Sequence, residues 1–158
     1  MAGLKYANYI ITEPGTPPQL PAQAKMIEDQ RKAGNYADII FTPTINDSIV
    51  KGSFFMMGGW TANLKGTKQV QMELAHTHDY DEVLGFTGSD MDNPKELGGE
   101  IEIWLEDEKY IINKGCLIFI PKGMKHCPLS IIRVDRPFFV FAAALTTGYT
   151  RAWEEKYR

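Results

Sequence analysis

Short apolar runs separated by turn-forming residues fill the chain from Ala37 onward. The runs are rich in β-branched and aromatic residues, and Gly, Pro, Asn and Asp stand between them, which is typical of strands joined by tight turns. Many such strands in one chain indicate an all-β domain, either a sandwich or a barrel. The predicted strands span residues 39–45, 48–60, 68–75, 82–87, 100–105, 109–112, 116–120, 130–134 and 137–146.

The first 36 residues have a different character. Residues 22–34 are rich in helix formers and close on a glycine, which predicts a short helix. With 158 residues, the chain is long enough for one domain with a proper core. We therefore expect an N-terminal arm and short helix over 1–36, a β-barrel over 37–150 and a C-terminal tail over 151–158. Prolines in the arm predict an extended backbone before the helix: Pro14, Pro17, Pro18 and Pro21.

Charge and hydropathy exclude several kinds of partner. The formal net charge is -3 and no block of Lys or Arg occurs, so we expect no nucleic-acid partner and no membrane partner. No apolar run approaches the roughly 18 residues that span a bilayer, and the first residues do not form a signal region. Cys116 and Cys127 are too few for a disulfide framework. These features predict a soluble cytoplasmic protein.

The segment from Gln69 to Leu74 alternates strictly between polar and apolar residues, and His76 and His78 follow it at the same spacing. Successive side chains of a strand point to opposite faces, so the apolar residues of this segment must face the core. His76 and His78 continue the apolar set and are expected to point inward side by side. Glu82 keeps the same parity if the turn at residues 79–81 adds no bulge.

The third and last histidine of the chain, His126, follows a proline–glycine turn at residues 121–125. Three imidazoles and one carboxylate suit a divalent transition metal. A lone inward histidine is more often a hydrogen-bonded core residue, but burying four such groups unpartnered would cost on the order of a few kcal/mol each. Cys127 is a possible soft ligand. If the strand stays extended there, Cys127 faces away from the metal and is a small buried thiol.

These residues resemble the two sequence motifs of the cupin superfamily. His76, His78 and Glu82 match the middle of the first motif in full. The second motif is matched by Gly115, Pro121, Gly123 and His126, with Ser130 where an asparagine usually stands. The departures are Val70 in place of the first glycine and Gly88 one residue before the closing glycine of the first motif.

The resemblance to cupins implies a double-stranded β-helix, or jelly-roll barrel, with a metal ion inside its wider mouth. It also implies that His76, His78, Glu82 and His126 are the metal ligands, with Glu82 a candidate catalytic base. The expected cofactor is one divalent transition metal ion: Fe, Mn, Ni, Zn or Cu. Ligand type alone does not select among these metals.

An apolar pocket is expected around the metal, suited to a small organic substrate that chelates the ion through oxygen. Arg133 and Arg136 could pair with a substrate carboxylate, and Lys122 and Lys125 could steer an anion, although exposed positions are favoured for all four. The acidic loop at residues 89–99 could cover the mouth as a lid. Candidate inward residues are Phe54, Met56, Met72, Phe86, Ile101, Ile103, Ile118 and Ile120, with Trp60, Trp104 and Tyr110 as aromatic possibilities.

Residues 137–145 are apolar on both faces, so this strand needs a second layer, either the N-terminal arm or a partner subunit. We expect a homodimer.

The leading functional hypothesis is a metal-dependent enzyme acting on a small chelating metabolite, with dioxygenase or other oxidoreductase chemistry ahead of isomerase, lyase or decarboxylase chemistry. A non-catalytic small-molecule binding module and a structural, storage-type protein are the alternatives.

Overall fold

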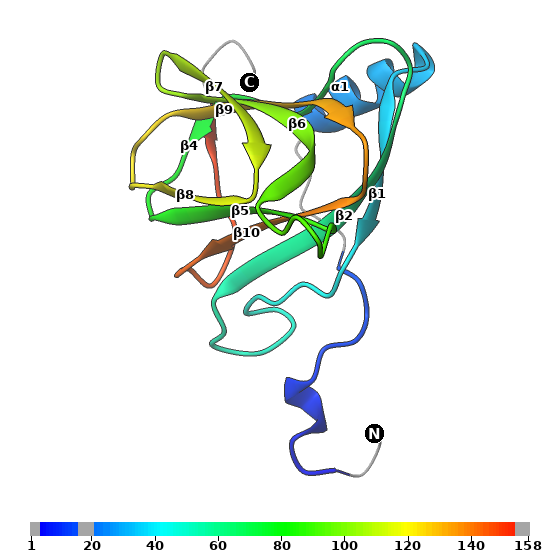
Figure 1. Ribbon diagram of the computed structural model, residues 1–158. Helices are drawn as coiled ribbons and strands as arrows, with labels where there is room; N and C mark the ends of the chain where they lie inside the picture. The colour runs from blue at the N-terminus through cyan, green and yellow to red at the C-terminus, as the bar shows by residue number, and fades with distance from the viewer. Residues whose placement is uncertain (1–3, 16–20, 154–158) are drawn as a thin grey trace.

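Two antiparallel sheets face each other and enclose a cavity in the computed structural model (Figure 1). The structure describes residues 4–15 and 21–153. The arrangement is a jelly roll with one α-helix, which confirms the predicted all-β fold class. The predictions for Pro17 and Pro18, and for the end of the tail at residues 154–158, lie outside the described residues.

The first sheet has five strands in the order β1-β2-β10-β5-β8, and every neighbouring pair is antiparallel. The strand β10 lies at its centre, as expected of a run that is apolar on both faces. The bounds of these strands are β1 Tyr36–Phe41, β2 Phe55–Lys65, β5 Glu82–Gly88, β8 Cys116–Ile120 and β10 Phe138–Ala144.

The second sheet has the order β11-β4-β9-β6-β7, and β3 also pairs with β9. The long strand β9 therefore joins both short strands of the first predicted motif to the rest of the sheet. The bounds are β3 Val70–Glu73, β4 His76–Thr77, β6 Glu96–Leu105, β7 Glu108–Lys114, β9 His126–Val134 and β11 Ala152–Trp153.

The helix α1, Pro21–Lys32, packs against β3 and β1. Its end is fixed by Gly34, which has a φ of 77°, while the N–H groups of Gly34 and Asn35 donate to the carbonyls of Arg31 and Gln30. The Gln30 side chain accepts a hydrogen bond from the Gln71 N–H and donates one to the Gln71 carbonyl. This pairing holds α1 against the edge of the barrel.

Residues 4–15 form an arm that projects away from the barrel, with the short 3-10 helix η1, Ala7–Tyr9, near its outer end (Figure 1). The arm joins the barrel where the Gly15 N–H donates to the Thr42 carbonyl. No helix in the described part of the chain is long and apolar enough to cross a membrane.

Two strand predictions need correction. The strand expected over residues 48–60 does not start at Ser48, because residues 47–53 form a turn in which the Asp47 carboxylate accepts the Gly52 N–H and Gly52 adopts a φ of 80°. The strand β2 therefore begins at Phe55, and the parity of its first residues is reversed. Phe55 is buried, whereas Phe54 and Met56, which we expected to point inward, are 48% and 36% exposed.

Candidate metal centre

Three strands and one turn bring the four predicted ligands together. His76 belongs to β4, Glu82 starts β5 and His126 starts β9, while His78 directly follows β4. His76 and His126 are register partners across the β4–β9 pair. All four side chains are buried, as the alternation predicted for His76 and His78.

The turn at residues 121–124 is docked on the turn that follows His78. The Gly123 N–H donates to the His78 carbonyl, and the Lys122 N–H donates to the Asp81 carboxylate. Gly123 has a φ of 81°, which a residue with a side chain adopts only at a cost. The proline–glycine spacing of the second motif therefore sets the distance between the two ligand-bearing segments.

Each histidine of the cluster is oriented by a backbone carbonyl. The Nδ1 atoms of His76, His78 and His126 lie 2.6, 2.6 and 3.1 Å from the carbonyl oxygens of Leu74, Thr150 and Met124. A carbonyl can only accept, so each Nδ1 carries a proton, and in the neutral form of such a ring Nε2 is the atom with the lone pair that binds a metal. This is how proteins fix the tautomer of a metal-ligating imidazole.

The Nε2 atoms of the three histidines and a Glu82 oxygen form a buried cluster inside the barrel. His76 Nε2 lies 3.2 Å from His78 Nε2, and Glu82 Oε2 lies 3.2 Å from His126 Nε2 and 3.5 Å from His78 Nε2. Both Glu82 oxygens and His126 Nε2 are buried without a hydrogen-bond partner among the described residues. Lone pairs this close repel unless a cation lies between them, so the cluster has the arrangement of a metal site.

The acid–base behaviour of the cluster favours metal binding. Burial, together with the nearby His126, lowers the pKa of His76 to about 3, so this imidazole is neutral near pH 7. Burial alone would raise the pKa of Glu82, but the adjacent imidazoles of His126 and His78 outweigh burial and hold this pKa at about 2. The neutral imidazole and the ionised carboxylate are the forms that bind metals.

Cys127 corrects the expectation that its thiol faces away from the metal. Its φ is 66°, and β9 carries an extra residue at this point relative to β6, since Leu105 pairs with His126 while Ile103 pairs with Leu129. Such a bulge breaks the alternation of side chains. Cys127 therefore lines the same cavity as His126 while remaining buried, as expected of a small thiol. Burial raises its pKa well above the usual range.

The C-terminal segment contributes residues that the sequence analysis assigned to the barrel end and the tail. The Thr150 carbonyl accepts from His78 Nδ1 and from the Tyr80 hydroxyl. Tyr149 packs edge-on against His78, and Tyr80 stacks on the same ring at 4.7 Å between centroids. The strand β11 then pairs with β4. The end of the described chain is thus built onto the ligand cluster.

Arg151 places a guanidinium group beside the cavity. Its Nη2 lies 2.8 Å from Glu73 Oε2, its Nη1 donates to Gln23 Oε1, and the group lies over the Tyr149 ring. Gln23 also donates to Glu73. No periodicity in the sequence indicates this cluster, because α1, β3 and the C-terminal segment meet only in the folded protein.

The cavity has a volume of about 200 Å³, and its wall is mainly apolar. Met72 and Ile101 line it as expected, whereas Trp60, Trp104 and Tyr110 do not. Trp104 instead donates to Glu102, and Tyr110 is exposed and donates to Glu108. Other lining residues are Ile27, Ile39, Met57, Leu84, Leu129, Ile131, Val140 and Ala142.

The charged groups considered as substrate contacts lie elsewhere. Arg133 pairs with Glu100 and Asp135, and Arg136 pairs with Asp90. Lys122 and Lys125 do not line the cavity, and neither does the loop at residues 89–99. The structure therefore gives no support to a lid formed by this loop.

Comparison with known proteins finds similarity of fold. No protein-family model matches the chain, and no curated protein matches its sequence. The structure is similar to that of oxalate oxidase in complex with the substrate analogue glycolate, with a TM-score of 0.47 and 11% identity, covering 74% of this chain and 54% of that one. It is similar to KdgF from Halomonas sp., with a TM-score of 0.42 and 12% identity, covering 72% of this chain and 80% of that one.

A third similar structure is an RmlC-like cupin from Shewanella frigidimarina, with a TM-score of 0.41 and 10% identity, covering 70% of this chain and 85% of that one. The chain spans about half the length of the matched oxalate oxidase, and 45% of the length of a matched DMSP lyase. The jelly-roll arrangement of the two antiparallel sheets agrees with the fold expected from the two motifs.

Proposed function

We propose that this protein is a metal-dependent enzyme in which His76, His78, Glu82 and His126 hold one divalent transition metal ion. The observation that carries the proposal is the buried cluster of His78 Nε2, His126 Nε2 and Glu82 Oε2, which lies beside His76 Nε2. The Nδ1 atom of each of the three imidazoles contacts a backbone carbonyl oxygen. The donor set fits Fe, Mn, Ni, Zn or Cu. When bound, such an ion supplies Lewis acidity or redox chemistry and leaves coordination positions for a substrate.

The substrate that fits this cavity is a small organic molecule with oxygen atoms that chelate the metal and an otherwise apolar body. The mainly apolar wall of the cavity suits the apolar body of such a molecule. Burial raises the pKa of Tyr149 well above the usual range, so its phenol keeps its proton and can donate a hydrogen bond inside the cavity. Glu82, the proposed catalytic base, can accept a proton through a carboxylate oxygen that does not bind the metal.

Among the reactions such a site supports, oxygen-dependent oxidation is our leading proposal, with isomerase, lyase or decarboxylase chemistry as the alternative. The identity of the metal in the purified protein distinguishes these two reaction classes. If the protein catalyses oxygen-dependent oxidation, elemental analysis and electron paramagnetic resonance of protein purified without added metal should find near-stoichiometric Fe, Mn, Cu or Ni. Oxygen uptake with candidate chelating substrates then tests it directly, whereas zinc would favour the alternative.

Glu82→Gln tests the metal site itself. The variant removes the negative charge from the centre of the cluster and should lower the bound metal to a small fraction of the wild-type amount. Glu96→Gln is the matched control, because Glu96 is an exposed carboxylate paired with Lys114. Full metal occupancy in Glu82→Gln would contradict the assignment. A protein that binds metal and ligand without turnover would support a non-catalytic binding module.

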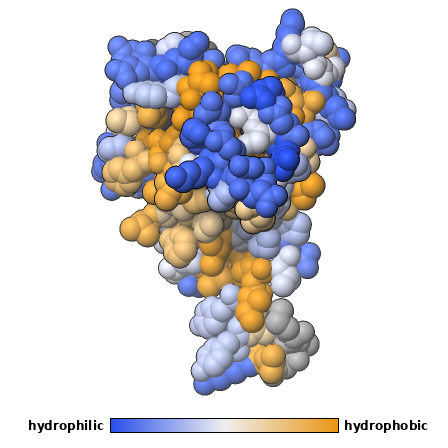
Figure 2. Space-filling view, viewed as in Figure 1, coloured by the Kyte–Doolittle hydropathy of each residue, from blue (hydrophilic) through white to orange (hydrophobic). Residues whose placement is uncertain are grey.

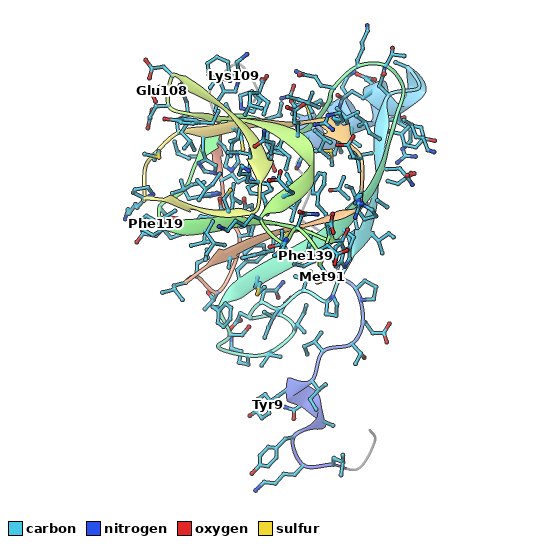
Figure 3. The ribbon with its side chains drawn as sticks, viewed as in Figure 1. Tyr9, Met91, Glu108, Lys109, Phe119 and Phe139 are labelled. Atoms are coloured by element: carbon cyan, nitrogen blue, oxygen red, sulfur yellow. The ribbon has the colours of Figure 1, made fainter. Side chains whose placement is uncertain are left out.

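We also propose that the outer face of the five-stranded sheet forms a homodimer. Three rows of register partners across this sheet consist of twelve uncharged residues, and two of these, Leu117 and Phe119, are 70% and 61% exposed. Phe119 lies at the outside of the barrel in Figure 3, where Figure 2 shows hydrophobic surface. A charge-free apolar face suits a second copy of itself. The rows are Ile40, Trp60, Phe139 and Thr87; Gly58, Phe141, Gly85 and Leu117; and Met56, Ala143, Val83 and Phe119.

Leu117→Asp should convert the dimer into a monomer, as measured by light scattering during size-exclusion chromatography. Ile111→Asp is the control, because Ile111 is an exposed apolar residue on β7 of the other sheet. A monomeric wild-type protein at micromolar concentration would contradict the proposed dimer.

A further inference from the structure

The cavity contains a second set of possible ligand atoms, in which the Cys127 thiol, not used by the proposed function, joins His76 and His126. The Cys127 sulfur and one nitrogen each of His76 and His126 lie within 4.8 Å of one another, and all three residues are buried. A separate set of the same size consists of His78, Glu82 and His126. The two sets share His126. The other members are an imidazole and a thiol in the first set, and an imidazole and a carboxylate in the second.

The position of Cys127 results from the backbone. In an extended strand, neighbouring residues point to opposite faces, and Cys127 would lie outside the cavity. The φ of 66° and the extra residue in β9 turn both His126 and Cys127 inward. Cys127 is 3% exposed and lines the cavity beside His76 and Glu82.

We propose that Cys127 makes the cavity a site for soft metal cations, bound by His76, His126 and the Cys127 sulfur. Thiolate sulfur selects cations such as Cu(I), Zn(II) and Cd(II), whereas a carboxylate favours harder ions such as Mn(II). When the sulfur binds the cation, the thiol proton is released to solvent. Because His126 belongs to both sets, the protein holds a soft or a hard cation at one time and does not hold both.

Cd(II) is the probe for the soft set, and Mn(II) is the probe for the hard set. Titration of the metal-free protein with Cd(II) should produce an ultraviolet thiolate-to-metal charge-transfer band that saturates at one ion per chain. Added Cd(II) should also displace bound Mn(II), which is measured by the return of the free Mn(II) signal in electron paramagnetic resonance.

The chain offers a matched control for the sulfur ligand, because its other thiol, Cys116, lies on β8 and does not line the cavity. Cys116→Ser should keep the Cd(II) band. Cys127→Ser should lose the band and bind Cd(II) at least about 10-fold more weakly, while its affinity for Mn(II) stays within about two-fold of the wild-type value. A band that persists in Cys127→Ser, or that disappears in Cys116→Ser, overturns the proposal.

A measurement on folded protein that retains Cys127 covers the case in which Cys127→Ser does not fold. X-ray absorption at the cadmium edge of the Cys116→Ser protein should show one sulfur neighbour together with nitrogen neighbours, and a shell of oxygen and nitrogen alone overturns the proposal. Glu82→Gln distinguishes failure of this proposal from failure of the proposed function. The variant should lose Mn(II) binding, which tests the Glu82 site, and should keep the Cd(II) band, which tests the Cys127 site.

Discussion

The two ligand-bearing segments of the cavity, residues 70–82 and residues 121–128, reach the same point by different backbone geometries. In the first segment, alternation of an extended strand brings Val70, Leu74, His76 and His78 to the buried side. In the second, a turn at Gly123 and a left-handed residue at Cys127 interrupt the strand geometry. In the first segment the two histidines, His76 and His78, are two residues apart, whereas the second segment presents two neighbouring side chains, His126 and Cys127, to the cavity.

The proposed ligands of the first segment bind through nitrogen and oxygen, while the second segment adds a sulfur atom. The first segment contributes two imidazoles and the Glu82 carboxylate, and the second contributes an imidazole and a thiol. On this view, the preference of the cavity for hard or soft cations depends on whether Glu82 of the first segment or Cys127 of the second binds the ion. Changes in each segment test that view separately.

Replacement of one histidine in each segment should have the largest effect. His126→Ala removes the ligand that both sets share, so binding of Mn(II) and of Cd(II) should each weaken by more than about 100-fold, beyond the loss typical of a ligand's hydrogen-bond partner. His78→Ala removes a ligand of the hard set alone, so Mn(II) binding should weaken while the Cd(II) band remains. Isothermal titration with each ion measures both, and equal losses of Cd(II) binding in the two variants would contradict the distinction.

Acid should destabilise the metal-free protein through the first segment. The pKa of His76 is lowered to about 3 in the folded state from an ordinary 6.5, so the unfolded chain binds more protons between these values. Stability is therefore lost as the pH falls from about 6.5 toward 3, by up to about 1.4 kcal/mol per pH unit for this one group. Glu82, with its pKa lowered to about 2, adds a loss of the same sign below about pH 4.5.

Urea unfolding of metal-free protein between pH 7 and pH 4 measures this acid sensitivity. His76→Gln should flatten the pH dependence of the unfolding free energy by about one proton over this range. If the wild-type and His76→Gln curves have the same slope, His76 is not the group responsible.

Gly123→Ala should weaken the second segment. A side chain at a φ of 81° costs about 1–2 kcal/mol, and the turn it distorts holds the His78 carbonyl through the Gly123 N–H. The free energy of unfolding should fall by that amount, and metal affinity should fall with it. Gly148→Ala is the control, because a Cβ at either glycine meets no atom within 4 Å and Gly148 lacks the positive φ. Equal stability of the two variants would contradict the role of the turn.

The same two segments separate what sequence predicts from what it does not. Alternation over residues 69–78 predicted the inward direction of His76 and His78, because polar and apolar residues differ in their cost of burial. The strand at residues 116–120 was predicted with its observed bounds. The direction of Cys127 was wrong, because no residue type in the sequence marks a left-handed backbone at a cysteine. Phe54 and Met56 were placed inward because the turn at residues 47–53 was taken for a strand.

The cluster of Gln23, Glu73 and Arg151 was also missed by the sequence analysis, but for a different reason. Gln23, Glu73 and Arg151 come from α1, β3 and the segment before β11, and they meet through tertiary packing alone. Helix propensity located α1 but gave no information on which strand it packs against. The position of Arg151 beside the cavity likewise depends on the pairing of β11 with β4, and two strands of two residues each are too short for the sequence to indicate that they pair.

The smallest expected effect concerns the support of His78 by the C-terminal segment. Tyr80→Phe keeps the ring stacked on His78 but removes the hydroxyl that donates to the Thr150 carbonyl and accepts the Thr150 N–H. We expect the free energy of unfolding to fall by about 1 kcal/mol. Because the same carbonyl fixes His78 Nδ1, Mn(II) affinity should fall by up to about 10-fold. Tyr110→Phe is the control, since it removes an exposed hydroxyl that contacts Glu108 far from the cavity, and equal Mn(II) affinities in the two variants would show that the C-terminal segment does not position His78.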